Sequence, residues 1–273
     1  MEVNDRPLAE VEVAVLDVET TGLSPPLGDR VVEIAVVSGR LDGEPRCWST
    51  LIDPERPMAA EATLVNGITD EDLAGRPIFA KVLPELKRLL ENRILVAHNA
   101  PFDLQFLHAE YARAGEEFEP GVVFDTLGLA RRRYRYESNG LARVLLELGL
   151  QNHDPHRALG DARATFEVYR RFALDLPLDC PRVCDWLEAQ GGPGFHQGPA
   201  APELPADHPL LIALERNAGV RIRYTDGRGA ITERSIVPLA ISGIHLSAWC
   251  RLRETDRTFR VDRIEVIELE RSS

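Results

Sequence analysis

Residues 11–23 read VEVAVLDVETTGL, and this stretch decides the fold because it joins a strand pattern to the first acids of a candidate site. Val11 to Val18 is rich in valine, which is typical of a buried β-strand. Alternation along a strand places Asp17 and Glu19 on the same side. Two neighbouring carboxylates repel each other, so a fold keeps such a pair mainly where cations neutralise it.

The rest of the chain divides into three parts. We predict strands over residues 30–39, 44–52 and 94–97, and helices over 78–90, 101–114, 125–134, 139–148 and 158–174. Strands followed by alternating strands and helices indicate an α/β or α+β domain over residues 1–176. Residues 177–206 are expected to hold a helix and a linker rich in Gly and Pro. Several short strands over 207–273 predict a small β domain.

Composition and charge limit the function classes. The chain has 273 residues, of which 44% are hydrophobic, and no run is long and apolar enough to span a bilayer. We expect no signal peptide, and four cysteines without a zinc or disulfide pattern indicate a cytoplasmic protein without a membrane partner. The net charge of −12 argues against broad capture of nucleic acid. Residues 207–273 hold 11 basic and 10 acidic residues, so the acidic excess belongs to the first part.

Two later stretches add acids and a histidine to the first pair. HNAPFD (residues 98–103) opens a helix after a strand, with Asp103 in the first turn. HRALGD (residues 156–161) places His156 five residues before Asp161, at the mouth of a long helix. Oxygen ligands suit Mg²⁺ or Mn²⁺, and a histidine nearby can take a proton from water. Together with Asp17 and Glu19 these residues predict two-metal phosphodiester hydrolysis.

Residues beside these acids are candidates for substrate binding. The hydroxyls of Thr20 and Thr21 could hold a terminal nucleotide, Gly22 allows close approach of the backbone, and Leu23 could wedge against a base. In the second stretch, Asn99 could bond a sugar or phosphate and Phe102 could stack on a base. The simpler alternatives are capping roles for His98 and Asn99 and a core role for Phe102. The candidates are Thr20, Thr21, Gly22, Leu23, His98, Asn99 and Phe102.

The ordered stretches DVETTGL, VAHNAPFDLQFL and HRALGDA resemble the DnaQ-like 3′–5′ exonucleases of the DEDDh branch. VNGITDEDL (residues 65–73) and VFDTLGLARR (residues 123–132) are also similar to family segments, and the resemblance covers about residues 10–175. It implies a ribonuclease-H-like fold, a mixed sheet with helices. It also implies two divalent metals. The chemistry of the residues favours Mg²⁺ or Mn²⁺ and would release nucleoside 5′-monophosphates. By this resemblance Asp17, Glu19, Asp103 and Asp161 hold the metals, and His156 is the general base.

Residues 207–270 are similar to the WYL domain, a small SH3-like β-barrel module found as a nucleic-acid- or ligand-sensing appendage. The resemblance rests on Arg223-Tyr224, on residues 237–239 and on residues 257–264, whereas Ile244-His245-Leu246 stands where the family has Trp-Tyr-Leu. Alternation predicts a core face and an outer face for the strand from His245. The core face would hold Leu246, Ala248, Cys250 and Leu252, and the outer face His245, Ser247, Trp249, Arg251 and Arg253.

Two arginine-rich surfaces are candidates for nucleic-acid binding, because arginine grips phosphates and stacks on bases. The alternatives are a solvated helix face and an ordinary barrel surface. The first surface comprises Arg131, Arg132, Arg133 and Arg135, and the second Trp249, Arg251, Arg253, Arg260 and Arg263.

The sequence therefore predicts a two-domain, metal-dependent 3′–5′ exonuclease acting on single-stranded DNA, with the WYL-like domain assisting substrate binding or regulation. DNA repair or processing is the expected setting, with nucleic acid and repair or replication proteins as partners. Two alternatives remain open. One is an RNA 3′–5′ exonuclease, and the other is a nucleotide-sensing regulator with a secondary nuclease activity.

Overall fold

The computed structural model describes residues 3–134, 136–176, 178–192, 204, 208–215, 218–225, 230–242, 245–252 and 255–270. The chain forms two compact units, residues 1–196 and 197–273. The first unit extends past the predicted end at Leu176, because helix α8 (Val183–Gln190) packs Trp186 into its core. Within the described ranges, no helix has the length and apolar character needed to cross a membrane.

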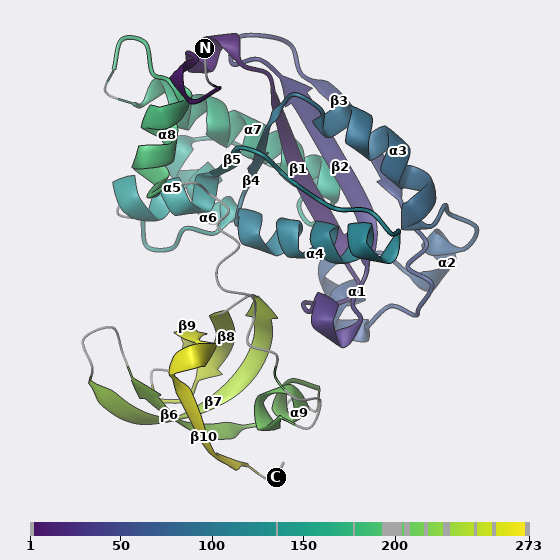
Figure 1. Ribbon diagram of the computed structural model, residues 1–273, viewed down its shortest axis with the longest axis vertical. Coiled ribbons are helices and arrows are strands. Elements are labelled where there is room, and N and C mark those ends of the chain that lie inside the picture. Colours follow the sequence, from purple (N-terminus) through teal and green to yellow (C-terminus); the bar gives the residue numbers. More distant parts are fainter. Residues whose placement is uncertain are drawn as a thin grey trace. The chain divides into compact units, whose positions relative to one another are not determined.

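The first unit is built on a five-stranded mixed sheet with the order β3-β2-β1-β4-β5 (Figure 1). The strands are β1 (Val13–Thr20), β2 (Val31–Gly39), β3 (Arg46–Leu51), β4 (Ile94–Ala97) and β5 (Val123–Asp125). Strand β1 pairs antiparallel with β2 and parallel with β4, and β4 pairs parallel with β5. The predicted mixed sheet with helices is confirmed.

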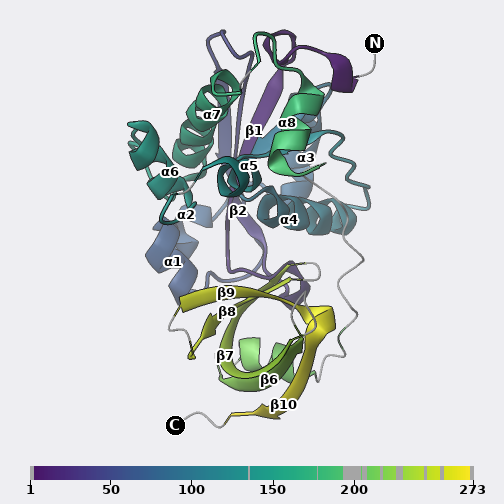
Figure 2. The same ribbon diagram turned by 90° about the vertical axis from the view of Figure 1, so that its left-hand side faces the viewer.

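Helices cover both faces of this sheet (Figure 2). One face packs against α5 (Thr126–Arg133), α6 (Leu141–Leu148), α7 (Ala158–Leu174) and α8, and the other against α3 (Phe79–Leu90) and α4 (Ala100–Arg113). Two short helices, α1 (Ala60–Asn66) and α2 (Asp70–Leu73), and strand β5 were not predicted. Short 3₁₀ turns occupy Val3–Asp5, Leu8–Glu10, Pro25–Leu27 and Val261–Arg263.

The alternation of β1 determines on which face the acids lie. Val13 and Val15 pack in the apolar cluster that includes α7, whereas Leu16 and its even-numbered neighbours pack with α3 and α4. Because side chains alternate along a strand, Asp17 and Glu19 continue the face of Val13 and Val15. The two carboxylates therefore lie on the side of the sheet that α7 covers.

The second unit is a five-stranded antiparallel sheet with the order β10-β6-β7-β8-β9. Its elements are α9 (Pro209–Glu215), β6 (Val220–Thr225), β7 (Ile231–Ser242), β8 (His245–Cys250), β9 (Thr255–Arg260) and β10 (Ile264–Leu269). Leu246, Ala248 and Cys250 are buried as predicted. The core assignment of Leu252 is wrong, since β8 ends at Cys250 and Leu252 is 64% exposed.

The buried phenol of Tyr169 in α7 leads to a stability prediction. Its hydroxyl is buried and has no hydrogen-bond partner among the described residues. An unpaired buried polar group costs free energy, so Tyr169→Phe should leave the free energy of unfolding unchanged or raise it by up to about 1 kcal/mol. Urea denaturation checks this, with Tyr134→Phe as the control because the Tyr134 hydroxyl donates to Asp175 Oδ2 at 2.9 Å. A loss of stability in Tyr169→Phe larger than in Tyr134→Phe would contradict the prediction.

Candidate active site

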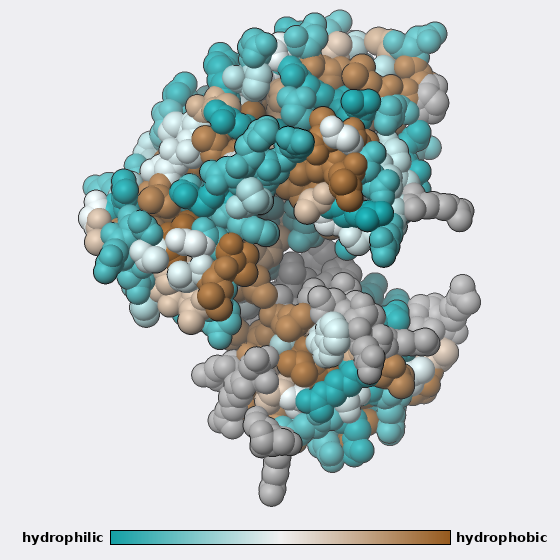
Figure 3. Space-filling view, turned by 180° about the vertical axis from the view of Figure 1, so that it is seen from behind, coloured by the Kyte–Doolittle hydropathy of each residue, from teal (hydrophilic) through white to brown (hydrophobic). Residues whose placement is uncertain are grey.

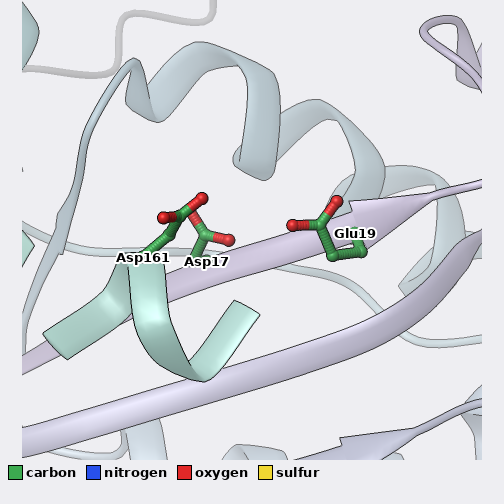
Figure 4. A group of neighbouring side chains, drawn as sticks. All are labelled: Asp17, Glu19 and Asp161. Atoms are coloured by element: carbon green, nitrogen blue, oxygen red, sulfur yellow. The ribbon is translucent and has the colours of Figure 1, made fainter. Parts of the chain in front are cut away.

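Three carboxylates meet where the last part of β1 faces the first turn of α7. One oxygen from each of Asp17, Glu19 and Asp161 lies within 4.8 Å of the others. Figure 4 shows the Asp17 and Asp161 carboxylates side by side, with Glu19 further along β1. All donors are carboxylate oxygens, the ligand type that hard divalent cations prefer. This group could therefore bind a divalent metal ion.

Burial and mutual repulsion both act on this group. Burial raises the pKa of Asp17 well above its ordinary value, and Asp103, Asp161, Glu19 and Glu33 raise it further. Burial, with Asp161 and Glu33, raises the pKa of Glu19 to about 7. Charges gathered in this way are costly unless a cation compensates them. The raised pKa values of Asp17 and Glu19 therefore agree with a group of carboxylates that binds a cation.

Asp103 reaches the same region from the first turn of α4. Its carboxylate is 4% exposed, and its Oδ1 accepts a hydrogen bond from the Val18 N–H at 3.2 Å. It lies near enough to Asp17 to raise the pKa of that residue, but it is outside the group of three. The structure thus brings three of the four predicted acids together and places the fourth beside Asp17.

The loop before α7 carries His156 and is folded tightly around Asp161. The Asp161 carboxylate accepts hydrogen bonds from the Asn152 side chain and from the His156 backbone N–H. His156 is exposed and has a φ of 60°, which is left-handed and uncommon for a residue with a Cβ. A Cβ at Gly160 would stand 1.9 Å from the Asp154 carbonyl oxygen, so only glycine allows the loop to close on the helix. His156 is therefore held at the entrance of α7.

The threonine hydroxyls of the loop after β1 form hydrogen bonds within that loop. Thr20 donates to the Gly22 carbonyl at 2.5 Å, and Thr21 donates to Asp29 Oδ1 at 3.1 Å. A Cβ at Gly22 would meet the Asp29 carboxylate at 2.4 Å, so the glycine makes room for that side chain. The two hydroxyls thus shape the loop, whereas Leu23 is 48% exposed and remains accessible to a substrate.

The residues at the start of α4 also make hydrogen bonds and ring contacts with other parts of the first unit. His98 bonds Thr126 Oγ1 and the Asn139 carbonyl, each at 2.9 Å, and burial lowers its pKa to about 4. Asn99 is exposed, has a φ of 72°, and donates its backbone N–H to Asp125 Oδ1 at 3.1 Å. Phe102 is half-buried against Phe106, with ring centroids 5.1 Å apart. Both ring nitrogens of His98 therefore have protein partners, and the Asn99 side chain is the most accessible of the three.

The depressed pKa of His98 predicts a pH dependence. Its folded pKa of about 4 lies below the ordinary histidine value of 6.5, so folding favours the neutral ring. The stability that this residue contributes is present above pH 6.5 and is lost as the pH falls toward 4. The stability advantage of the wild type over His98→Gln, measured by urea denaturation, should therefore shrink across this window. An advantage that does not change with pH would contradict the prediction.

Sequence reasoning missed a short apolar segment beside the acids. Leu64 is 86% and Val65 is 59% exposed on α1. The space-filling view of one face of the molecule shows apolar patches within the hydrophilic surface (Figure 3). The next residue, Asn66, is buried and donates to the Thr20 carbonyl at 3.4 Å, and it also bonds Glu19. The exposed pair therefore belongs to the helix whose last residue bonds Glu19. No local pattern indicates this, because the link runs through Asn66.

An ion pair between a buried carboxylate and a half-exposed arginine, next to the group, was also missed. Glu33 in β2 binds Arg157, the residue after His156, through two hydrogen bonds of 2.9 and 3.0 Å. The signal was present in the sequence, since an acid within the apolar run of residues 30–39 needs a partner when buried.

The two predicted arginine surfaces differ in how their charges are compensated. Arg131, Arg132 and Arg133 are exposed at the end of α5, and among the described residues none of them has a carboxylate partner. In the second unit Trp249 is 41% exposed, whereas Arg251 pairs with Glu270 at 3.0 Å. Arg260 and Arg263 are half-buried, and Arg135 and Arg253 lie outside the described residues.

Comparisons with known proteins agree with this architecture. Residues 14–169, more than half of the chain, match the RNase T family model, described as exonuclease, and residues 209–269 match the WYL domain model. DNA polymerase III subunit epsilon of Treponema pallidum is 35% identical over 165 residues, which are 58% of this chain and 75% of that protein. DNA polymerase III PolC-type of Thermotoga petrophila is 41% identical over 162 residues, which are 58% of this chain but 12% of that protein. The chain thus spans only a small part of the polymerase.

A solved structure extends the comparison. Exonuclease X in complex with 5′-overhanging duplex DNA has a TM-score of 0.52 and is 26% identical, covering 66% of this chain and 99% of that one. The first unit accordingly has the mixed α/β, ribonuclease-H-like exonuclease fold. The predicted resemblance is confirmed for both parts, and the chain belongs to the exonuclease family, joining a DnaQ-type 3′–5′ exonuclease domain to a C-terminal WYL domain.

Proposed function

We propose that the protein hydrolyses single-stranded DNA from its 3′ end and releases nucleoside 5′-monophosphates, using two divalent ions, Mg²⁺ or Mn²⁺. The observation that carries this is the meeting of Asp17, Glu19 and Asp161 on one side of the sheet, with Asp103 beside them. These four residues would hold the ions. When bound there, divalent ions lower the pKa of water and stabilise charge on the leaving 3′ oxygen.

The chain's own residues would do the remaining work. His156, exposed at the entrance of α7, takes the proton of the attacking water as general base. Leu23 of the loop after β1, with Leu64 and Val65 of α1, offers exposed apolar surface near the acids on which the terminal base can pack. Asn99, also exposed, is the candidate for a polar contact to the sugar or phosphate.

Relatives and neighbours support DNA as the substrate class, since one is a DNA polymerase III subunit and another was solved with DNA. The protein would then act in DNA repair or processing, with replication or repair proteins as partners, in the cytoplasm. RNA remains the alternative substrate, because the chemistry acts on the phosphodiester.

The second unit would assist by binding substrate. We infer a closed SH3-like barrel whose outer face carries Trp249, with aromatic and arginine side chains as a platform for single strands. Tethering such a module raises the local substrate concentration without new catalytic contacts. Arg131, Arg132 and Arg133 of α5 are the candidate grip on the strand within the first unit.

The direct test incubates the purified protein with 5′-labelled single-stranded DNA and matched RNA, in Mg²⁺, in Mn²⁺ and in EDTA. A metal-dependent ladder shortening from the 3′ end, absent in Asp103→Ala, is the expected result, and the faster strand identifies the sugar. No degradation of either strand with either metal would reject the proposal. It would favour the alternative of a nucleotide-sensing regulator.

A truncated chain, residues 1–190, tests the role of the second unit. It should hydrolyse a short oligonucleotide at the rate of the whole chain but bind or degrade longer strands less well. Unchanged binding and degradation of long strands would rule out the tether.

A further inference from the structure

Glu33 occupies an unusual place for an acid that is outside the metal-binding group. It stands on β2 directly opposite Glu19 of β1, and residues opposite each other in an antiparallel pair project to the same face. Its side chain is 6% exposed, and it helps to raise the pKa of both Asp17 and Glu19. A further carboxylate this close to the three of the group adds repulsion, so its presence calls for a physical reason.

The hydrogen bonds of Glu33 supply that reason, because they all lead to the start of α7. Oε1 accepts from Arg157 Nη2 at 2.9 Å, and Oε2 accepts from Arg157 Nε at 3.0 Å and from the Ala158 N–H at 3.1 Å. Arg157 is the N-cap residue of α7, and its own side chain does not cap the helix. Glu33 therefore caps α7 from the neighbouring strand and also grips its N-cap residue with a two-pronged ion pair.

The segment held in this way carries two candidate residues of the site. His156 immediately precedes Arg157, and Asp161 lies one turn into α7. Their counterparts Asp17 and Glu19 belong to β1, which is hydrogen-bonded to the strand that bears Glu33. Glu33 thus links the strand beside β1 directly to the start of α7.

We propose that Glu33 is a positioning residue that, through Arg157 and the Ala158 N–H, sets the place of Asp161 and His156 relative to Asp17 and Glu19. The inference rests on the proposed metal-dependent hydrolysis. Misplacing one ligand weakens metal binding and slows the chemical step, and residues that orient metal ligands typically affect affinity or activity by about 10–100-fold.

The chain provides a matched control in Glu110 of α4. Glu110 is 1% exposed, accepts two hydrogen bonds from Arg30 at 2.7 and 3.0 Å, and accepts the Val31 N–H at 3.3 Å. It therefore has the same kind of ion pair, similar burial and a similar backbone bond as Glu33. Its bonds join α4 to Arg30 and to Val31, the first residue of β2, and do not involve α7.

The experiment compares Glu33→Gln with Glu110→Gln in the full chain. Mn²⁺ affinity is measured by calorimetry, and kcat and KM are measured on a short single-stranded oligonucleotide, each corrected for the folded fraction. Both variants should melt at a lower temperature than the wild type. Only Glu33→Gln should also bind Mn²⁺ about tenfold more weakly and lose about tenfold or more in kcat at little change in KM.

Arg157→Lys provides a second variant if Glu33→Gln folds poorly. It keeps the charge and loses the two-pronged geometry, so it should show a smaller defect of the same kind. Metal affinity and kcat in Glu33→Gln and Arg157→Lys equal to those in Glu110→Gln would overturn the inference alone. Absence of Mn²⁺ binding and hydrolysis in the wild type would overturn the proposed function and this inference with it.

Discussion

Asp17→Asn should lower the rate of hydrolysis by on the order of 10³-fold and at the same time stabilise the metal-free protein at pH 7 and above. The first effect follows from the loss of the central carboxylate of the group that faces Asp161. The second follows from electrostatics, because burial raises the pKa of Asp17 and four neighbouring acids raise it further. A folded pKa above the unfolded value means that stability is lost as the pH rises.

The measurement is urea denaturation in EDTA at several pH values, beside a hydrolysis assay in Mn²⁺. The wild type should lose stability between about pH 4.5 and 7, the window set by Glu19, whose pKa rises from 4.5 to about 7. In Asp17→Asn the loss of stability over this pH range should be smaller, since removing one negative charge reduces the repulsion among the remaining carboxylates. Asp179→Asn, at an exposed position, should change neither property. A metal-free Asp17→Asn that is less stable than the wild type at pH 8 would contradict the argument.

His156→Gly and His156→Ala should both lower kcat by about 10²–10⁴-fold, the usual contribution of a general base. They should differ in stability, however. The φ of 60° at this position is unfavourable for any residue with a Cβ and costs glycine nothing. His156→Gly should therefore be more stable than His156→Ala by about 1 kcal/mol.

Steady-state kinetics and urea denaturation of the two variants test this pair of effects together. Asn92→Gly is the matched control, because Asn92 is exposed and has a φ of 56° outside the proposed site. Because asparagine tolerates the left-handed region well, Asn92→Gly should change neither stability nor activity appreciably. Near-normal turnover in His156→Gly would remove His156 from the role of general base.

The sequence predicted those features of the fold and site that depend on local patterns. The valine-rich run before Asp17 predicted β1, and the helical spacing after His156 predicted α7 with its observed bounds of Ala158–Leu174. Alternation then placed Asp17 and Glu19 on one face, and the structure has Asp161 of α7 facing them. The approximate assembly of the site could thus be predicted, because each motif lies at the end of a regular element.

What escaped prediction depends on partners distant in sequence or on where an element ends. Thr21 was a candidate for contact with a terminal nucleotide, and its bond to Asp29, eight residues further along the chain, could not be foreseen. The proposed positioning role of Glu33 depends on Arg157, which is distant in sequence and contacts Glu33 only in the folded protein. Leu252 followed the alternation of β8, yet the strand ends two residues earlier. In each case the local pattern carries no information about the distant partner or about the end of the element.

The distance along the chain between β1 and α7 has a consequence for biosynthesis. Asp17 and Glu19 leave the ribosome before Asp161, which emerges only after all five strands of the first sheet have been made. Domains tend to fold as units while the chain is synthesised at about 5–20 residues per second. A nascent chain that has not reached α7 therefore lacks a complete set of ligands. Nuclease activity toward the messenger RNA and other nucleic acids around the translating ribosome would therefore arise only when synthesis of the exonuclease domain is nearly complete.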